Sequence, residues 1–172
     1  DVAPSRGLGD VYKRQILYKE DNTIKDSKEV RSYLQSKKKK LFSYEIFENL
    51  DLSKGNYEEL EFQFSSFVGC NFTQSSWNKS HLLFSNLQNT MLKNTKMEKM
   101  KIFDTDFSGA TLEQVDFAGA KIKHVSFAGA KLIQVDFSKV LLAEEINFQD
   151  AQIVDCKFPE EVGSGLLYHE NR

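Results

Sequence analysis

The sequence has few of the features on which catalytic and membrane proteins usually depend. Its 172 residues include two prolines, two cysteines and three histidines. No apolar run approaches the ~20 residues that a membrane-spanning helix needs, and no basic stretch precedes an apolar segment as in a signal peptide. The formal net charge of −2 is too small to favour nucleic-acid binding. We therefore expect neither a membrane nor a nucleic-acid partner. The two cysteines, as free thiols, would suit a reducing compartment, and on that ground we expect the protein to be cytoplasmic.

Candidate catalytic and ligand-binding residues are also scarce. The three histidines, His81, His124 and His169, do not have the spacing of metal ligands, and the glycines near Gly7 and Gly163 do not form a phosphate-binding loop. Asp116 and Asp136 are twenty residues apart and could suggest a pair of catalytic carboxylates, but aligned residues of one kind are expected in any repeat. The sequence predicts no enzyme, no metal or cofactor site and no small-molecule substrate.

What the sequence does contain is a period of five. Large apolar residues recur at every fifth position, which at a hydrophobic content of 40% has a chance probability on the order of 10⁻⁸. A period of five matches neither the 3.6 of an α-helix nor the 2.0 of a single strand, so each unit is predicted to be a short extended segment ending in a corner. The nineteen positions are Leu52, Tyr57, Phe62, Phe67, Phe72, Trp77, Leu82, Leu87, Leu92, Met97, Ile102, Phe107, Leu112, Phe117, Ile122, Phe127, Leu132, Phe137 and Leu142.

The residues before each large one agree with this interpretation. Because side chains alternate in an extended chain, the residue two positions earlier points the same way as the large one, and the residue between them points outward. The first is small, as in Cys70, Ala110 and Ala130, and the second is mostly polar, as in Asp116 and Asp136. Each unit therefore places one large and one small side chain in a core.

The units resemble those of the pentapeptide-repeat family, which read approximately A-(D/N)-(L/F)-X-X. Segments 115–119 (VDFAG) and 130–134 (AKLIQ) have this form, and the resemblance covers about two thirds of the chain. It implies an all-β solenoid, namely a right-handed quadrilateral (four-sided) β-helix with twenty residues in each coil. The resemblance is specific for the fold and says little about function.

A coil of twenty residues fits this sequence. Along the sequence from 102 to 137, the successive large residues alternate between phenylalanine and leucine or isoleucine. Residues twenty apart are therefore alike, so like side chains lie over like. At a coil spacing of about 4.8 Å, nearly five coils would form a rod about 25 Å long. Cys70 and Cys156 would then lie about 19 Å apart, too far for a disulfide.

The period slips once near its end. After Leu142 it resumes at Phe148, which predicts one extra residue within 143–147, accommodated as a bulge. Pro159 then ends the pattern, because proline lacks the N–H that a strand ladder needs.

The chain divides by composition into four segments. We expect 1–15 to be an adaptor-derived, non-native segment, 16–46 to be an N-terminal cap, 47–158 to be the repeat β-helix and 159–172 to be a C-terminal tail. On this interpretation the native N-terminus is missing. Within the cap, Asp26 and Glu29 resemble a capping box, and apolar residues follow at helical spacing, which predicts one short helix.

One outward face of the predicted rod carries apolar residues where the other faces carry polar ones. These residues, the candidate interaction face, are Phe64, Leu83, Phe84 and Phe103. A cluster of exposed aromatic side chains is usually covered. The first candidate is the N-terminal helix, folding back with Val30, Tyr33 and Leu34; the second is a protein partner or self-association.

Two functions remain open. The first is a non-enzymatic scaffold or protein-interaction module that presents a face of the rod to a macromolecular partner. The second follows from the resemblance, because some family members are DNA mimics that bind or protect a type II topoisomerase such as DNA gyrase. A DNA mimic needs an acidic surface, whereas 52–158 holds 11 Lys/Arg against 13 Asp/Glu. The sequence favours the scaffold.

Overall fold

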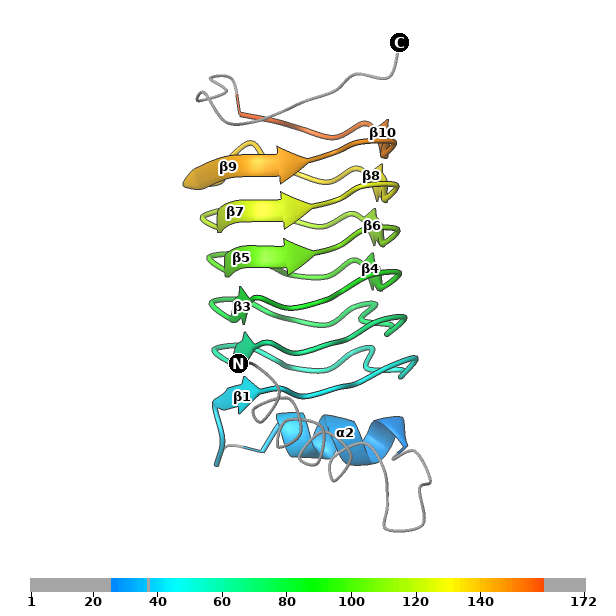
Figure 1. Cartoon of the computed structure of the whole chain (residues 1–172), viewed down its shortest axis with the longest axis vertical. Coiled ribbons are helices and arrows are strands. Elements are labelled where there is room, and N and C mark those ends of the chain that lie inside the picture. Colours follow the sequence, from blue (N-terminus) through cyan, green and yellow to red (C-terminus); the bar gives the residue numbers. More distant parts are fainter. Residues whose placement is uncertain (1–25, 37, 160–172) are drawn as a thin grey trace, which may run out of the picture.

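The computed structural model describes residues 26–36 and 38–159 (Figure 1). It is a β-solenoid of about six coils, with one short helix at its N-terminal end. The elements in chain order are α2 (Ser27–Leu34), β1 (Leu41–Ser43), β2 (Glu61–Gln63), β3 (His81–Leu83), β4 (Met91–Lys93), β5 (Lys101–Asp106), β6 (Thr111–Glu113), β7 (Lys121–Ser126), β8 (Lys131–Ile133), β9 (Leu142–Asn147) and β10 (Gln152–Val154).

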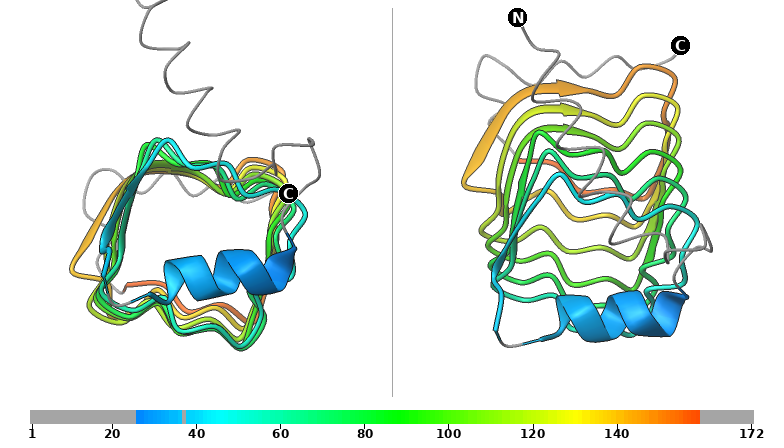
Figure 2. Two further views of the ribbon diagram at one scale, coloured as in Figure 1. Left: turned by 90° about the horizontal axis from the view of Figure 1, so that it is seen from below. Right: turned by 60° about the horizontal axis from the view of Figure 1, so that its bottom comes forward.

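Each strand pairs in parallel with the strand one coil away. Strands β1, β2, β3, β5, β7 and β9 form a six-stranded sheet, and β10, β8, β6 and β4 form a four-stranded one. Glu61 lies opposite His81, twenty residues further on, and single bridges such as Asn56 with Ser76 keep this spacing on the other sides. The coil is four-sided when viewed along the rod (Figure 2). The right-handed quadrilateral β-helix is thus confirmed.

The predicted core is confirmed at eighteen of its nineteen positions, which are all buried; the exception is Leu142. Like side chains do lie over like. The Phe107 and Phe127 rings stack with centroids 5.2 Å apart, and Phe117 and Phe137 stack at 5.0 Å. Stacked rings fill a narrow core at the high density that protein interiors need.

The position of the extra residue differs from the prediction. Ala143, not Leu142, lies opposite the core residue Ile122, and Leu142 lies opposite Lys121. The Leu141 N–H donates to Ala120 O at 2.8 Å, which is the bond that Lys121 makes one coil earlier to Met100. Leu141 and Leu142 together therefore oppose one residue, as in a β-bulge. The bulge lies at 141–142 rather than within 143–147, and it leaves Leu142 only partly buried.

The backbone turns a corner two residues after each core residue. From Lys54 to Gln134, every fifth residue has a positive φ, between +50° and +72°. Glycine adopts this conformation without strain, and Gly109 illustrates a second reason for glycine here. A Cβ on Gly109 would lie 2.3 Å from Asn89 Oδ1, in the corner of the neighbouring coil.

The polar residue before each core residue has a structural task at many corners. Its Oδ1 atom accepts the backbone N–H two residues on, as Asp106 does from Ser108 at 2.8 Å. This is the side-chain turn that Asn and Asp make most readily, so it explains why these residues recur at that position. The same bond is made by Asp51, Asn56, Asn71, Asn86, Asp116, Asp136 and Asn147.

The helix α2 closes the N-terminal end of the solenoid. It begins after Asp26, whose side chain accepts the Glu29 N–H at 2.8 Å, as the capping pattern predicts. Val30 and Leu34 are buried in the core cluster, and the Tyr33 ring meets Phe42 edge-on at 5.3 Å. The helix lies across the opening of the coil (Figure 2).

This placement corrects one expectation. The helix was expected to cover Phe64, Phe84 and Phe103 on the side of the rod, but its apolar residues instead pack on the end of the core. The end of a solenoid exposes its whole apolar cross-section, here the first-coil rings of Phe42 and Phe47. Covering this end removes more apolar surface from water than covering a few aromatic side chains on one face would.

Truncating a core ring should weaken the solenoid far more than changing the outward residue beside it. Phe117 is fully buried, so Phe117→Ala should cost about 3–5 kcal/mol of unfolding free energy. Ala118→Ser, immediately outside the core, should cost less than about 0.5 kcal/mol. Urea unfolding followed by circular dichroism measures both variants. Equal midpoints would contradict the core assignment.

Acid should weaken the corners that contain Asp51 and Asp136. Hydrogen bonds from Ser53 lower the pKa of Asp51. At Asp136, burial alone would raise the pKa of the carboxyl, but hydrogen bonds from Ser138 and nearby lysines outweigh it, so the pKa is lowered. The stability that a lowered pKa supplies is complete above the ordinary carboxyl pKa and is lost as pH falls through the lowered value.

The double variant Asp51→Asn/Asp136→Asn tests this dependence. Asparagine keeps the oxygen that accepts the backbone N–H but takes up no proton. Urea midpoints should therefore fall less steeply for the variant than for the wild type between about pH 5 and about pH 3. Parallel pH profiles would show that these carboxylates do not contribute to acid sensitivity.

Candidate interaction face

Three exposed aromatic rings form a column along one corner of the solenoid, at the end of the six-stranded sheet. Tyr44, Phe64 and Phe84 occupy equivalent positions in successive coils, and we call them the aromatic ladder. Their ring centroids lie 5.2 and 5.0 Å apart, and each pair is within 8° of parallel. The three side chains are 47%, 46% and 53% exposed. The ladder therefore presents stacked ring edges to solvent.

The fold does not require aromatic residues at these corners. All three have positive φ, +58°, +51° and +51°, a conformation in which a bulky residue is uncommon. Equivalent corners elsewhere carry small or polar residues, such as Gln74 and Asn94. The backbone places the Cβ atom of a corner residue outside the core, and at these three corners the rings stack on one another.

The structure places the four residues of the candidate interaction face together. Phe64 and Phe84 belong to the ladder, and Leu83 and Phe103 lie next to it on the outer surface of the sheet, opposite one another in register and partly buried. Whether these residues bind a partner stays a prediction. Tyr44 was missed, although it precedes Phe64 by the same twenty residues, because it lies before the first core position of the predicted period.

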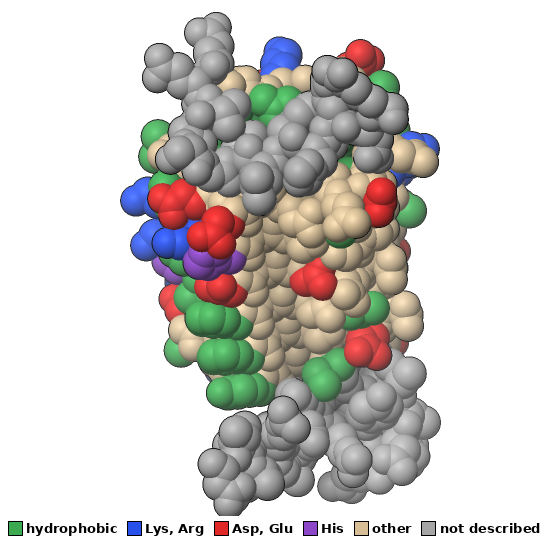
Figure 3. Space-filling model, turned by 45° about the horizontal axis from the view of Figure 1, so that its top comes forward, with side chains coloured by type: hydrophobic (Ala, Val, Ile, Leu, Met, Phe, Trp, Pro, Cys, Tyr) green, Lys and Arg blue, Asp and Glu red, His purple; other side chains and the backbone are tan. Residues whose placement is uncertain are grey.

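The same corner column continues with charged residues in the following coils. His124 Nδ1 lies 3.2 Å from Asp104 Oδ1, and its Nε2 lies 3.2 Å from Glu145 Oε1. On the adjacent sheet surface, Lys123 pairs with Glu144 at 3.1 Å. Figure 3 shows the column of hydrophobic side chains followed by acidic and histidine side chains. The corner thus has an apolar half and a charged half.

The outer surface of the four-stranded sheet has no comparable ladder. Met91 and Val154 are 41% and 46% exposed, but they occupy different columns and are separated by polar residues. Lys93 and Glu113 form an ion pair there at 3.1 Å. Single exposed apolar residues of this kind are normal on protein surfaces.

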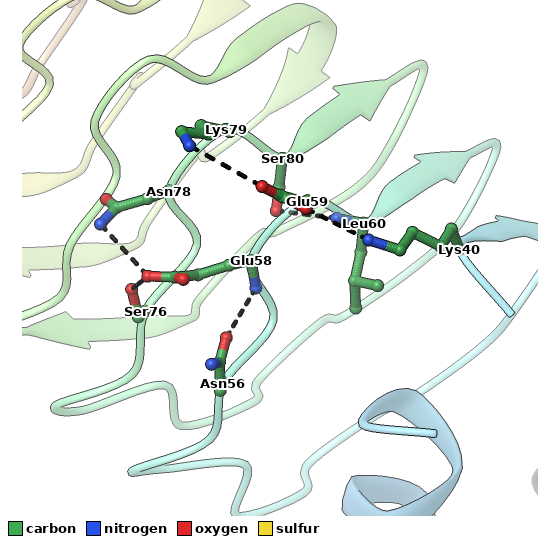
Figure 4. A network of polar contacts seen from close by, with 9 residues as sticks. All are labelled: Lys40, Asn56, Glu58, Glu59, Leu60, Ser76, Asn78, Lys79 and Ser80. Carbon is green, nitrogen blue, oxygen red and sulfur yellow. Dashed lines mark hydrogen bonds and ion pairs between the residues drawn. The ribbon is translucent and has the colours of Figure 1, made fainter. Parts of the chain in front are cut away.

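A polar network joins the first coils at another corner (Figure 4). Glu59 lies between Lys40 at 3.2 Å and Lys79 at 3.7 Å, and the hydrogen bond from Lys40 lowers the pKa of this carboxyl. Glu58 accepts a hydrogen bond from Asn78 in the next coil. The adjoining hollow of about 140 Å³ is smaller than a typical ligand site. The network links the first coils to one another.

The two cysteines and His81 are the other thiol and imidazole groups in the part of the chain that the structure describes. Burial raises the pKa of the Cys70 thiol to about 12, so this thiol stays protonated and is a poor nucleophile. Cys70 and Cys156 are both free. His81 lies 3.5 Å from Glu61, and His169 lies outside the described residues. Within 26–36 and 38–159, no group of three or more His, Cys, Asp or Glu side chains could hold a metal ion.

A polar cluster sits beneath the cap. Glu45 is 1% exposed, and its Oε1 accepts hydrogen bonds from Tyr33 at 2.8 Å and Lys39 at 3.4 Å. Burial raises the pKa of Tyr33. Burial alone would lower the pKa of the Lys39 ammonium, but its contacts with Tyr33 and Glu45 raise the pKa above the ordinary lysine value. The Lys39 ammonium also lies 4.9 Å from the centre of the Phe42 ring. Within the described residues, these contacts hold the cap on the end of the core and not over the ladder.

In the part of the chain that the structure describes, no helix is both long and apolar enough to cross a membrane. The search of curated protein sequences gave no match. A family model described as a pentapeptide repeat region matches residues 70–148.

Solved structures of similar shape are also pentapeptide-repeat proteins or are described by their resistance function. A trypsin-treated form of QnrB1, a plasmid-mediated fluoroquinolone resistance protein, has a TM-score of 0.65 at 21% identity, and the match covers 69% of this chain and 60% of that one. A pentapeptide repeat protein from the cyanobacterium Cyanothece 51142 gives 0.54 at 16% identity, covering 76% and 92%. One from the thylakoid lumen of Arabidopsis thaliana gives 0.53 at 17% identity, covering 66% and 73%.

At these identities the likeness concerns the fold alone, and the chain spans less than two thirds of the QnrB1 chain that it matches. The family model and the coils agree, however, because the matched residues 70–148 lie within a continuous run of coils that share one core and one corner geometry. Residues 70–148 are thus a pentapeptide-repeat region, and the resemblance of the coils to the pentapeptide-repeat family is confirmed.

Proposed function

We propose that this chain is a non-enzymatic scaffold that binds a protein partner through the aromatic ladder and the adjoining surface of the six-stranded sheet. The observation that carries the proposal is the ladder itself. Tyr44, Phe64 and Phe84 expose about half of each side chain at corners where the fold accepts polar residues. The family and its relatives of known structure share a repeat scaffold, which supports a binding role more than a catalytic one.

The ladder offers enough apolar surface to matter for binding. An aromatic side chain has about 200 Å² of surface, so three half-exposed rings offer about 300 Å². At about 25 cal/mol per Å², covering them would gain about 7 kcal/mol before the costs of association are subtracted. Because the rings already stack on one another, they lose little side-chain freedom when a partner covers them.

Surface charge argues against the DNA-mimic alternative. A mimic must present acidic groups along the rod in the manner of phosphates. Here Lys and Glu alternate between coils, as in Lys40–Glu59–Lys79 and Lys93–Glu113. The likeness to QnrB1 supports the shared fold, but the paired charges leave no continuous acidic stripe at the corner of Glu59 or on the four-stranded sheet.

We accordingly expect no effect on a type II topoisomerase. At micromolar concentration the protein should change neither DNA supercoiling by gyrase nor the inhibition of gyrase by a fluoroquinolone. The supercoiling assay, with and without the drug, measures both. Protection at a concentration stoichiometric with the enzyme would favour the DNA mimic over the scaffold.

The scaffold proposal predicts that partner capture depends on the ladder. Wild-type protein immobilised on a resin should retain at least one specific protein from a bacterial lysate, and Phe64→Ser/Phe84→Ser should lose it. Met91→Ser, which removes a similarly exposed apolar side chain from the four-stranded sheet, is the matched control and should retain it. Equal capture by all three proteins would contradict a role for the ladder.

A further inference from the structure

We infer that the partner of the aromatic ladder is an amphipathic α-helix lying along the solenoid axis, with an apolar stripe over the ladder and basic residues beyond it. This inference rests on the proposed function and specifies its partner. Three properties of the corner carry it: the spacing of the rings, the area that they offer, and the charges that follow them in the same column.

The ring spacing matches the pitch of a helix. The ladder repeats every 5.0–5.2 Å, and an α-helix brings a side chain back to the same face about every 5.4 Å along its axis. Over the two intervals of the ladder the mismatch is less than about 1 Å. Apolar side chains at positions i, i+4 and i+7 of a helix can therefore each meet one ring.

An extended peptide fits the ladder less well. Residues on one face of a strand are about 6.6–6.8 Å apart, so a strand along the axis falls out of step by about 1.5 Å at each ring. Strand addition is also unsuited to this face. The strands run across the rod, and within the six-stranded sheet each strand from β2 to β7 already has partners on both edges.

A second copy of the chain is a weaker candidate because of area. A stable dimer buries about 800 Å² on each partner, whereas the ladder supplies about 300 Å². A two-fold axis at Phe64 would pair the three rings with their counterparts but would overlap only the coils near the N-terminal end. An axis further along would set the charged half of one copy against the rings of the other. A single helix needs only the narrow strip that the ladder provides.

The charges beyond Phe84 specify the rest of the helix. The next three positions in the column are Asp104, His124 and Glu145, and Glu145 has a side chain that is 70% exposed. The two carboxylates flank a single imidazole, so this part of the column carries a net negative charge whether or not that ring is protonated. A helix whose apolar stripe lies over the ladder would place positions i+11 and i+18 near the two carboxylates, and Lys or Arg there would complement them.

A synthetic peptide tests the inference directly. The probe is a fluorescent peptide of about 22 residues, long enough to form a helix on binding, with leucine at i, i+4 and i+7, lysine at i+11 and i+18, and polar helix-forming residues elsewhere. The control peptide has the same composition, with its leucines at alternate positions. Fluorescence anisotropy measures affinity for the whole protein, and circular dichroism measures the helix content gained on binding.

We expect the helix-patterned peptide to bind at least about tenfold more tightly than the control peptide and to gain helix on binding. Phe64→Ser/Phe84→Ser should weaken binding by at least about tenfold, and Phe84→Ser alone should weaken it less. Asp104→Asn/Glu145→Gln should weaken it by about threefold at low salt. Met91→Ser should leave it unchanged. Thermal unfolding checks that each variant is folded, which we expect because all five substituted side chains lie outside the core.

Other results would overturn the inference in identifiable ways. Equal binding of the two peptides would exclude a helix-specific surface. No loss in Asp104→Asn/Glu145→Gln would exclude the basic half of the helix. A dimer of the protein alone in analytical ultracentrifugation, lost in Phe64→Ser/Phe84→Ser, would assign the ladder to self-association. If the helical peptide fails to bind but capture from lysate still depends on Phe64 and Phe84, the helix inference fails and the scaffold stands. If both fail, the proposed function fails as well.

Discussion

The backbone hydrogen bonds between coils are the interaction on which the rest of the structure depends. They join residues in adjacent coils at a constant offset, as in Leu52 N–H to Asn71 O at 2.8 Å and Phe107 N–H to Ser126 O at 2.7 Å. Since this offset is kept from coil to coil up to the bulge before β9, a side chain lies over its equivalent one coil away. The buried stack of Phe107 on Phe127 and the exposed stack of Phe64 on Phe84 are both consequences. One ladder stabilises the core, and the other forms a surface.

This constraint also explains how the chain accommodates its one irregularity. The bulge at Leu141 and Leu142 changes the spacing between paired residues of adjacent coils from twenty to twenty-one, so that Ala143 pairs with Ile122. With the extra residue absorbed at the start of β9, the next core ring, Phe148, stacks on Phe127 at 5.5 Å. At the bulge an alanine takes the core position that a large residue fills in other coils, so packing is weaker there. The following coil keeps its register.

The period of five predicted the coils, the parallel pairing of the strands and nearly the whole core, because every coil of a solenoid has the same backbone conformation and the same pattern of buried residues. The sequence could not decide between Leu142 and Ala143, since both are apolar and either choice restores the period at Phe148. The pairing of His124 with Glu145 depends on that choice and was hidden for the same reason. The period could not predict where α2 packs either, because that depends on which apolar surface of the folded solenoid is larger.

A solenoid can expose apolar surface at its ends and on its sides. In this chain the N-terminal end is covered by the helix, whereas the rings on the side stay partly exposed. At the N-terminal end, Val30 and Leu34 are buried within the core cluster. On the side, the rings of Tyr44, Phe64 and Phe84 remain about half exposed. Their spacing cannot be adjusted, because the hydrogen bonds between coils fix it near 5 Å. A partner must therefore bring its own period to the rod, and a single α-helix, with its pitch of about 5.4 Å, matches it better than a single strand, whose side chains on one face recur about every 6.7 Å.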